Sequence, residues 1–503
     1  MTLIDSALPY AELLERIRST VPRDTPIHLV GGAVRDLLLQ RPSHDLDFTL
    51  PKDAIRLSRK IAKSLGAPFF PIDRERDTGR IILTECSQQP DRDGNRLILD
   101  FASYRGKDLE SDLRDRDFTI NAIAINLDRP GSLFDPLGGA KDLKDGIIRA
   151  CSDTAFDSDP IRILRCVRLA IEFEFRIQKE TRKQIDKALP KLSFVSTERM
   201  RDELFRILEG PKPFSALRSL EAMRALDYVL PELSTLRGVD QSAPHIDNLW
   251  EHTFHTGLEL THVLNVLAIK PDPSLSANWR MGFIALKLGR FRCQLHEHLA
   301  TRLNPERSIP SLLMLAALYH DVGKPGTQVF QEERIRFLKH ELVGASMVAE
   351  RGRKLHLSNS EIERLRVIVK NHMRPNHLAN DKTPPSRRSI YRFFRDCDAA
   401  GVDICLLFLA DTLATYGPTL PEEIWMKHLD VVSALFEAWW ENREREISPP
   451  KLIDGDQLMQ VYQIEPGPKL GRLLEAIRES QAAGELQAYD DALEFAHTWL
   501  ENH

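Results

Sequence analysis

The sequence predicts an α+β protein in which a small head with a mixed sheet precedes a long, all-helical remainder. Through residues 1–150, strand-like and helix-like patterns alternate, whereas from Asp159 onward apolar residues recur with a period of about 3.6 residues. Residues 448–456 (SPPKLIDGD) and 465–471 (EPGPKLG) are rich in helix breakers. We therefore expect four domains: a head at 1–150, a helical neck at 151–235, a helical body at 236–445 and a C-terminal helical tail at 446–503.

Each element of the head has a local signal. Residues 27–32 (IHLVGG) are expected to form a buried strand that enters a turn, 33–40 (AVRDLLLQ) a helix and 45–50 (DLDFTL) a strand. An amphipathic helix is expected at 53–67, and two further strands at 79–86 and 95–103. In the neck, residues 161–175 and 198–210 have the pattern of helices.

The composition excludes several classes of protein. Of 503 residues, 42% are hydrophobic and 28% charged, as in an ordinary soluble protein, and the net charge of -5 gives no overall basic field for nucleic acid. The six cysteines form no CxxC pair, which argues against a zinc ribbon or a disulfide framework. The N-terminus lacks the pattern of a signal peptide, and the apolar run at 309–320 is too short for a bilayer. We expect a cytoplasmic protein with no membrane partner.

The head carries a candidate phosphate site followed by a pair of carboxylates. Gly31 and Gly32 stand between a strand and a helix, where free backbone N–H groups suit a triphosphate, and Arg35 lies one turn further on. Taken alone, the glycines are also explained by a tight turn. Asp45 and Asp47 follow, on one face of the next strand. An exposed strand edge would explain this pair alone.

A third carboxylate suggests what the pair does. Asp100 lies in another predicted strand, with apolar neighbours on both sides. Three carboxylates on adjacent strands can hold two Mg²⁺ ions, which take oxygen ligands and bridge substrate phosphates. Two such ions stabilise the attacking and leaving oxygens of an in-line phosphoryl or nucleotidyl transfer. The sequence therefore predicts Asp45, Asp47 and Asp100 as catalytic groups, with the first two as Mg²⁺ ligands.

The order of motifs resembles the class II tRNA nucleotidyltransferase and bacterial poly(A) polymerase family, within the DNA polymerase beta superfamily. The motifs are GGxxRD from Gly31, HDLDF from His44, RDFTINA from Arg116 and DPIRILRCVRLA from Asp159. They cover roughly residues 28 to 210. The resemblance implies a transferase that acts on the tRNA 3′ end with CTP as its nucleotide, or with both CTP and ATP.

The same resemblance assigns the nucleotide site. It implies that Arg116, Asp117 and Asn121 bind the ribose and phosphates of the incoming nucleotide, although a helix cap is the alternative for the last two. Asp159 and Arg162 match the pair that reads the base of CTP or ATP. The glutamate that precedes this pair in the family is Ser158 here.

Two further features of this region bear on function. Arg165 shares a helical face with Arg162 and is a candidate triphosphate contact, with a surface ion pair as the alternative. Only fifteen residues, FASYRGKDLESDLRD, separate Asp100 from Arg116, where CCA-adding relatives carry a flexible loop. In this family such a shortening is the mark of CC-adding enzymes, so we expect CC addition, with full CCA addition as the alternative.

Two basic stretches are candidates for RNA backbone contacts. Residues 161–210 hold 12 Lys and Arg against 8 Asp and Glu, and residues 384–396 (PPSRRSIYRFFRD) interleave arginines with aromatics. A solvated charged face is the alternative for each.

The helical body carries a second pattern, which resembles the HD superfamily of metal-dependent phosphohydrolases. Its residues are His252, His320, Asp321, His340, His372 and Asp411. Imidazole and carboxylate together suit a transition metal such as Mn, Fe, Co or Ni. Lys324 is a candidate phosphate contact, and His255 is read as a neighbour, not a ligand. Buried histidines can also be ordinary core groups.

Three functions remain open at this stage. The first is a tRNA 3′-end nucleotidyltransferase with an HD domain. The second is a poly(A) polymerase, which would use the same chemistry without control of length. The third is an HD phosphohydrolase whose head only binds RNA.

Overall fold

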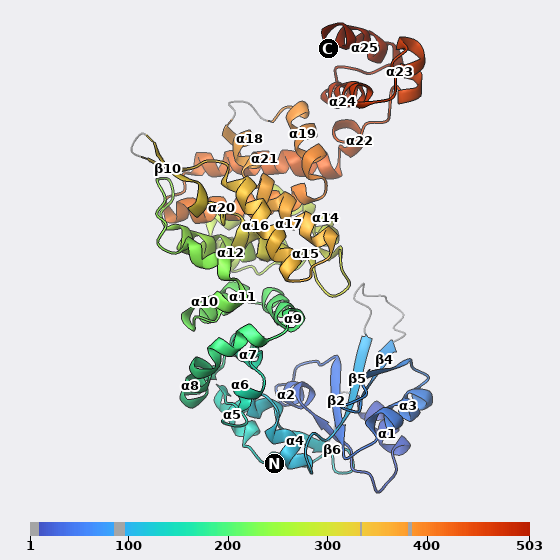
Figure 1. The fold of residues 1–503 in the computed structure, drawn as a ribbon, viewed down its shortest axis with the longest axis vertical. Coiled ribbons are helices and arrows are strands. Elements are labelled where there is room, and N and C mark those ends of the chain that lie inside the picture. Colours follow the sequence, from blue (N-terminus) through green and yellow to red (C-terminus); the bar gives the residue numbers. More distant parts are fainter. Residues whose placement is uncertain (1–9, 85–95, 332–333, 381–384) are drawn as a thin grey trace. The chain divides into compact units, whose positions relative to one another are not determined.

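The computed structural model describes residues 10–84, 96–331, 334–380 and 385–503. The chain forms two compact units, residues 1–203 with 219–228 and residues 204–218 with 229–503. It is mixed α+β, as predicted, with the main sheet in the head and helices through most of the remainder (Figure 1). The division into four domains stays a prediction.

A seven-stranded mixed sheet forms the head, in the order β3-β4-β5-β2-β1-β6-β7. In it β2 and β5 run parallel, and the other neighbouring pairs are antiparallel. The strands are β1 (His28–Val30), β2 (Asp45–Leu50), β3 (Phe69–Asp73), β4 (Thr78–Thr84), β5 (Arg96–Ser103), β6 (Ala124–Asn126) and β7 (Leu133–Phe134). The expected strands at 79–86 and 95–103 correspond to β4 and β5, and their residues 85, 86 and 95 lie outside the described part.

Helices α1 (Ala11–Thr20) and α3 (Ala54–Leu65) pack against this sheet (Figure 1). The core between them includes Phe48 of β2 and Phe101 of β5, whose rings stack with centroids 4.7 Å apart. Because side chains alternate along a strand, the residue on either side of each phenylalanine faces the opposite side of the sheet. Three shorter helices complete the head: α2 (Gly32–Leu38), α4 (Leu109–Arg114) and α5 (Gly139–Asp145).

The segment after the head is helical, apart from the short pair β8 (Ile147–Ile148) and β9 (Arg176–Ile177). Its amphipathic helices bury their apolar faces, as the sequence pattern predicts. They are α6 (Ala155–Ser158), α7 (Arg162–Phe173), α8 (Lys179–Ala188), α9 (Thr197–Leu208), α10 (Pro213–Ala222) and α11 (Leu226–Val229).

The helical body contains two almost wholly apolar helices, α15 (Ile309–Tyr319) and α20 (Ala400–Tyr416), in its interior. Around them lie α12 (Leu249–Val266), α13 (Trp279–Leu288), α14 (Arg292–Ala300), α16 (His340–Lys354), α17 (Asn359–Asn371), α18 (Arg374–Asn380), α19 (Arg387–Cys397), α21 (Glu422–Trp440) and α22 (Arg443–Glu446). A hairpin of β10 (Gln328–Gln331) and β11 (Arg334–Phe337) precedes α16.

By length and composition, one described helix could cross a membrane, Ala400–Thr419. It is longer than the apolar run singled out in the sequence. However, 83% of its apolar window is buried inside the protein, as in the core helix of a globular domain.

The C-terminal tail is a group of three helices, α23 (Gly455–Tyr462), α24 (Pro468–Ala483) and α25 (Tyr489–Asn502) (Figure 1). They share a small hydrophobic core of their own, which includes Leu458, Leu473 and Ile477.

Candidate active site and candidate metal centre

Strands β2 and β5 bring the predicted carboxylates of the head together. Asp47 of β2 is the register partner of Asp100 of β5, and Asp45 lies two residues back on the same face as Asp47. Burial raises the pKa of Asp47, the nearby Arg116 opposes this effect, and the carboxylates of Asp100 and Asp45 add to it. Carboxylates held this close repel one another unless a cation lies among them. The donor set therefore fits divalent metal ions.

Gly31 lets the backbone approach these groups closely. A β-carbon built at this position would lie 2.8 Å from Asp47 Oδ2 and 3.1 Å from a terminal nitrogen of Arg116. The φ of Gly31 is +76°, a value that side chains disfavour. The turn therefore requires glycine for two reasons, and it lies directly beside the carboxylate cluster.

Asp100 is already engaged by a residue that the sequence did not suggest. Arg80 of β4 donates two hydrogen bonds to it, from Nε to Oδ1 and from a terminal nitrogen to Oδ2, both at 2.8 Å. Arg80 and Asp100 are direct partners in the antiparallel β4–β5 pairing. The guanidinium neutralises the third carboxylate, while each oxygen keeps a further lone pair for another ligand.

A buried network joins the predicted ribose and phosphate residues. Arg35 donates to Asn121 Oδ1 at 2.8 Å, and the Asn121 amide donates to Asp117 Oδ1 at 3.0 Å. Arg165 donates to Asp117 Oδ2 at 3.0 and 2.8 Å. Burial alone would raise the pKa of Asp117. Arg165, the Asn121 amide and the Phe118 N–H instead hold this pKa below its ordinary value.

This network bears on the alternatives left by the sequence, and the nucleotide contacts themselves stay a prediction. Asn121 ends a short 3-10 helix, residues 119–121, that has no side-chain cap, so the capping explanation is wrong. Arg165 is in an ion pair with the largely buried Asp117, not in one at an open surface.

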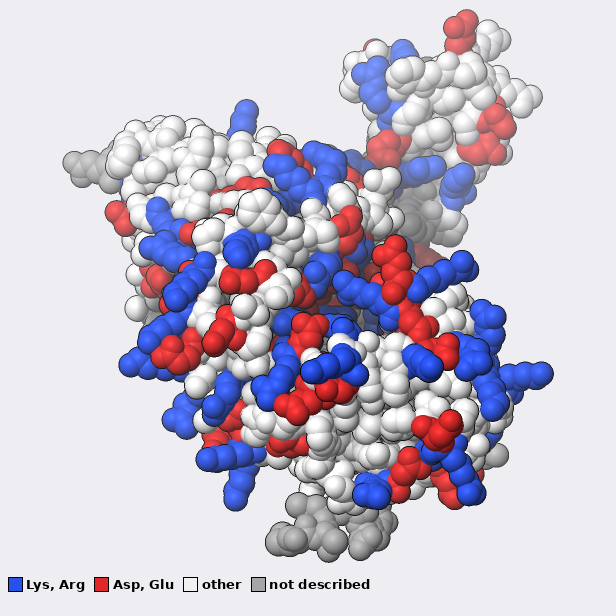
Figure 2. All heavy atoms as spheres, turned by 60° about the horizontal axis from the view of Figure 1, so that its bottom comes forward, with Lys and Arg blue, Asp and Glu red and all other residues white. Residues whose placement is uncertain are grey.

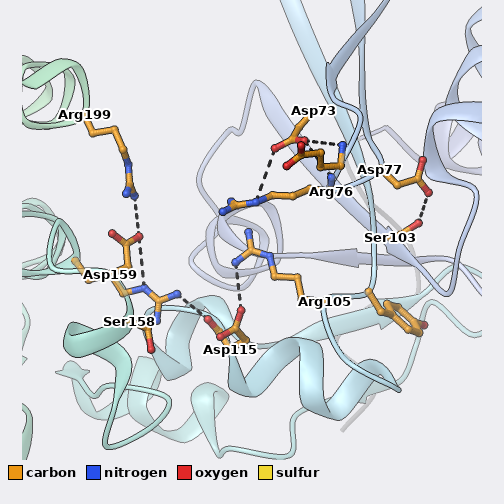
Figure 3. A pocket seen from close by; sticks show the side chains of 12 residues that line it. Asp73, Arg76, Asp77, Ser103, Arg105, Asp115, Ser158, Asp159 and Arg199 are labelled. Atoms are coloured by element: carbon orange, nitrogen blue, oxygen red, sulfur yellow. Dashed lines mark hydrogen bonds and ion pairs between the residues drawn. The ribbon is translucent and has the colours of Figure 1, made fainter. Parts of the chain in front are cut away.

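The predicted base-reading pair lies at a cavity of about 890 Å³ (Figure 3). Asp159 Oδ2 accepts a hydrogen bond from Arg199 at 2.7 Å and lies 4.0 Å from Arg162 Nε. Asp159 Oδ1 is buried and has no hydrogen-bond partner. Arg162 donates to the backbone carbonyls of Asp115 (2.7 Å), Arg116 (3.1 Å) and Ala155 (3.3 Å).

The connection from β5 to α4 is short. It consists of residues 104–108, and Asp108 begins α4 with a reciprocal pair of hydrogen bonds to Ser111. Tyr104 and Arg105 of this connection line the same cavity as Asp159. A capped helix directly after five residues leaves little length for a mobile loop at this position.

The six predicted residues of the helical body converge on one buried cluster. Asp321 lies at its centre: its Oδ2 is 3.5 Å from His252 Nε2 and 3.1 Å from His320 Nε2. Its Oδ1 is 3.2 Å from His340 Nε2 and 3.6 Å from His372 Nε2. Asp411 completes the group, with Oδ1 3.0 Å from His252 Nε2 and 3.7 Å from His320 Nε2.

The cluster forms two groups of metal-ligand geometry that share Asp321. One contains His252 and His320, the other His340 and His372. Several buried ligand atoms make no hydrogen bond: both ring nitrogens of His252, Nε2 of His320 and Oδ1 of Asp411. Polar atoms buried without partners are costly, and a cation would satisfy them. The donor set therefore fits a metal.

The charges of the cluster agree with this view. Burial alone would lower the pKa of His320, but the adjacent carboxylates of Asp321 and Asp411 raise it to about 10. Lys324 Nζ is bonded to Asp321 Oδ2 at 2.6 Å and to Gln241 at 2.7 Å, so it holds Asp321 in place. His255 pairs with Asp247 at 2.7 Å and is not among the ligand groups, as predicted.

Comparison with known proteins places these sites in context. A model of the Poly A polymerase head domain matches residues 27–149, one of a probable RNA and SrmB-binding site of polymerase A matches 174–236, and one of the HD domain matches 291–435. An A-adding tRNA nucleotidyltransferase of Deinococcus radiodurans is 31% identical over 94% of this chain and 95% of its own length. The chain belongs to the tRNA nucleotidyltransferase family.

Other relatives of this tRNA nucleotidyltransferase agree. A CC-adding tRNA nucleotidyltransferase of Thermus thermophilus is 30% identical, with 93% of each chain covered. Among solved structures, the apo form of a CCA-adding enzyme has a TM-score of 0.60 at 20% identity and covers 97% of this chain and 93% of its own. A Thermotoga maritima CCA-adding enzyme complexed with tRNA has a TM-score of 0.55 at 20% identity, covering 99% of this chain and 98% of its own. These structures share the fold. The predicted family and the HD domain are thus confirmed.

Basic residues of this nucleotidyltransferase are widely paired with acidic ones. In the neck stretch, Arg168 pairs with Glu203 at 2.6 Å and Lys191 with Asp157 at 2.9 Å. Figure 2 shows Lys and Arg interspersed with Asp and Glu over the face that it displays. In the second basic stretch, residues 384–396, the aromatic side chains are buried in the core. Pro384 of this stretch lies outside the described residues.

Sequence reasoning missed residues whose role depends on register or on distant contacts. Arg80 and Arg199 contact predicted site residues from other elements. His245 and His428 line a cavity of about 390 Å³ beside the HD cluster, and burial lowers the pKa of each to about 4. The HD motif contains neither histidine, so no local signal marked them.

Proposed function

We propose that this tRNA nucleotidyltransferase is a CC-adding enzyme, which transfers two C residues from CTP to the 3′ end of tRNA. The observation that carries the proposal is the five-residue connection between β5 and the capped helix α4. A long flexible loop at this position is what the resemblance associates with the switch from CTP to ATP. Without it, addition stops before the terminal A.

The geometry of the head supports the chemistry. Asp45 and Asp47 would hold Mg²⁺, which would supply charge stabilisation for the attacking and leaving oxygens. The 3′-hydroxyl oxygen of tRNA forms a bond to the α-phosphorus of CTP, the bond from that phosphorus to the bridging oxygen breaks, and pyrophosphate leaves. Asp100 lies beside Asp47 and receives the hydroxyl proton. Asn121, Asp117 and Arg116 orient the ribose and phosphates, with Gly31, Gly32, Arg35 and Arg165 completing the phosphate side.

The base is read by groups at the cavity. Asp159 Oδ1 has no partner and accepts a hydrogen bond from the exocyclic amine of the base. Arg199 holds the other oxygen at 2.7 Å, and Arg162 is fixed by three backbone carbonyls. This fixed arrangement supports selection of one base.

A second candidate is A addition, which the Deinococcus radiodurans relative favours by its name and its 31% identity. The two candidates separate in one assay. Purified protein receives tRNA ending at the discriminator base, or at CC, with CTP, ATP or both, and the products are resolved at single-nucleotide length. Growth by two residues with CTP, unchanged by ATP, supports CC addition.

The other outcomes each refute CC addition. Growth by one residue with ATP on tRNA ending in CC, with no growth from CTP on tRNA ending at the discriminator base, makes the protein A-adding. Growth by three residues only with both nucleotides makes it CCA-adding, and a long ladder with ATP alone makes it a poly(A) polymerase. A longer loop grafted between Tyr104 and Leu109 is expected to permit A addition; if it does not, the short connection is not the cause.

For the HD cluster we propose a second, metal-dependent phosphohydrolase activity. Two ligand groups that share Asp321 support this proposal: His252 and His320 would hold a transition metal with Asp321, as would His340 and His372. The metals would polarise a phosphoester and generate the hydrolytic nucleophile. Chelated protein reloaded with Mn²⁺, Co²⁺ or Ni²⁺ is expected to hydrolyse bis(p-nitrophenyl) phosphate.

Two variants test whether the two sites are separate. Asp321→Ala is expected to abolish the hydrolysis and spare nucleotide addition, whereas Asp47→Ala should do the reverse. Loss of both activities by either variant, with the fold intact by circular dichroism, would contradict the separation. Absence of hydrolysis with every metal would contradict the phosphohydrolase.

A further inference from the structure

Helix α19 carries three arginines on one outward face. Arg388, Arg392 and Arg395 recur at intervals of four and three residues, so they form a row about 10 Å long. The opposite face of the helix is fixed in the core of the body through Ile390, Phe393, Phe394 and Cys397, whereas Tyr391 flanks the arginines and donates a hydrogen bond to Glu475 at 3.1 Å. The arginine row is therefore held on a rigid support.

The C-terminal tail covers this row with carboxylates. Arg388 pairs with Glu485 at 2.5 Å, Arg392 with Glu479 at 2.6 Å, and Arg395 with Glu475 at 3.3 Å. Glu475 and Glu479 are one turn apart on α24, and we call these three carboxylates the glutamate row. Each arginine thus contacts a carboxylate of the tail: two of these are on α24, and Glu485 follows just after the C-terminal end of that helix.

The junction between tail and body is mainly electrostatic. The hydrophobic core of the tail consists, among the described residues, of side chains between 452 and 500, and none from α19 joins it. The three arginine side chains keep between 37% and 52% of their exposure while paired. Exposed ion pairs are individually weak and are screened by salt. The tail is a small helical unit attached by contacts that another polyanion can replace.

We propose that the arginine row is a binding surface for RNA phosphates, which the glutamate row occupies until RNA displaces the tail. Guanidinium groups bind phosphate oxygens in the same two-pronged manner as carboxylates, so both partners use the same donors. The row lies beyond residues 174–236, the segment that matches a probable RNA-binding site.

Two triple variants of the full chain test the proposal. E475Q/E479Q/E485Q and R388Q/R392Q/R395Q both remove the ion pairs between the two rows, so loosening of the tail is common to both. The arginine variant also removes the pair of Arg395 with Asp396 of the same helix, at 2.9 Å. Only the glutamate variant leaves the arginines free for RNA. Binding of a fluorescent tRNA transcript is measured without nucleotide, as a function of salt, so that the result does not depend on nucleotide transfer.

The glutamine-for-glutamate variant is expected to bind the tRNA more tightly than the wild type, with a steeper salt dependence. Three added phosphate contacts increase the slope of log K against log salt by about 2. Between 0.05 and 0.2 M salt, that increase corresponds to about a 16-fold larger loss of affinity. The glutamine-for-arginine variant should show no such gain.

Three results would overturn the proposal. Equal changes of tRNA affinity in both variants would mean that only the docking of the tail matters. An unchanged affinity and salt slope in the glutamate variant would mean that RNA does not use the row. A gain in affinity for polyglutamate but not for tRNA would make the row a surface for an acidic protein segment.

Discussion

The substitution Gly31→Ala should inactivate nucleotide addition by moving one carboxylate. The added methyl would lie 2.8 Å from Asp47 Oδ2, whereas ordinary contact begins at 3.4 Å, so one group must move by about 0.6 Å. That exceeds the tolerance of about 0.5 Å within which a catalytic constellation works. A displacement of this order lowers the rate by about 100-fold. The backbone, at φ +76°, adds strain of about 1–3 kcal/mol.

The assay separates the displaced carboxylate from the strained backbone. Gly66→Ala is the control for a positive φ without a steric contact, because Gly66 has φ +68° and its β-carbon would meet nothing within 4 Å. Its ψ of +28° is in the left-handed helical region, whereas that of Gly31 is −144°, so the strain is expected to be larger in Gly31→Ala. Both variants should melt at a lower temperature than the wild type, by roughly 3–10 °C for Gly31→Ala. Only Gly31→Ala should lose single-turnover CTP incorporation. Wild-type incorporation by Gly31→Ala, or an equal loss in both variants, would refute the reasoning.

Three more predictions follow from the same contacts. Arg80→Gln removes the cation beside Asp100, so the Mg²⁺ concentration needed for half-maximal incorporation of CTP should fall several-fold. An unchanged Mg²⁺ requirement would show that the Arg80–Asp100 pair opens when substrates bind. Arg165→Gln should destabilise the protein by about 1–3 kcal/mol at pH 7, because it leaves Asp117 buried without its main partner. The pKa of Asp117 is held below its ordinary value, so this stabilisation is present above about pH 4 and is lost as the pH falls through the lowered pKa. Denaturant melts of the variant and the wild type should therefore converge at acidic pH. Calorimetric titration of chelated protein with Mn²⁺ should show two ions bound in the HD cluster, and the melting temperature should rise. Asp321→Ala should abolish both the binding and the rise in melting temperature. Binding of only one ion would contradict the role of Asp321 as a ligand shared by two metals.

Local sequence was sufficient wherever chemistry depends on spacing within one element. The DLD alternation predicted that Asp45 and Asp47 share a face of β2, as they do. The HD pattern, although its residues lie on several segments, named six residues that the fold brings together, five of them in groups that could hold a metal. The α+β class followed from periodicity for the same reason, because a period of two or about 3.6 residues reports directly which side of an element is buried.

Tertiary structure decided what lies opposite each of these groups. The pairing of Arg80 with Asp100 depends on the register of β4 against β5, which no local pattern fixes. The basic stretch on α19 showed the same limit: its sequence has the composition of an RNA-binding segment, but its arginines are covered by carboxylates more than 75 residues further along the chain.

The sequence by itself therefore determined the family, the metal-binding chemistry of both sites and the order of the segments, because each is encoded in residue type and spacing. Only the tertiary structure decided that each carboxylate oxygen of Asp321 lies near a different pair of histidines. The same holds for Asp159, one of whose oxygens has no hydrogen-bond partner. The tertiary structure also decided that the tail covers an arginine row. Those features arise where distant segments meet, and the free energy of each contact depends on the geometry and burial of both partners.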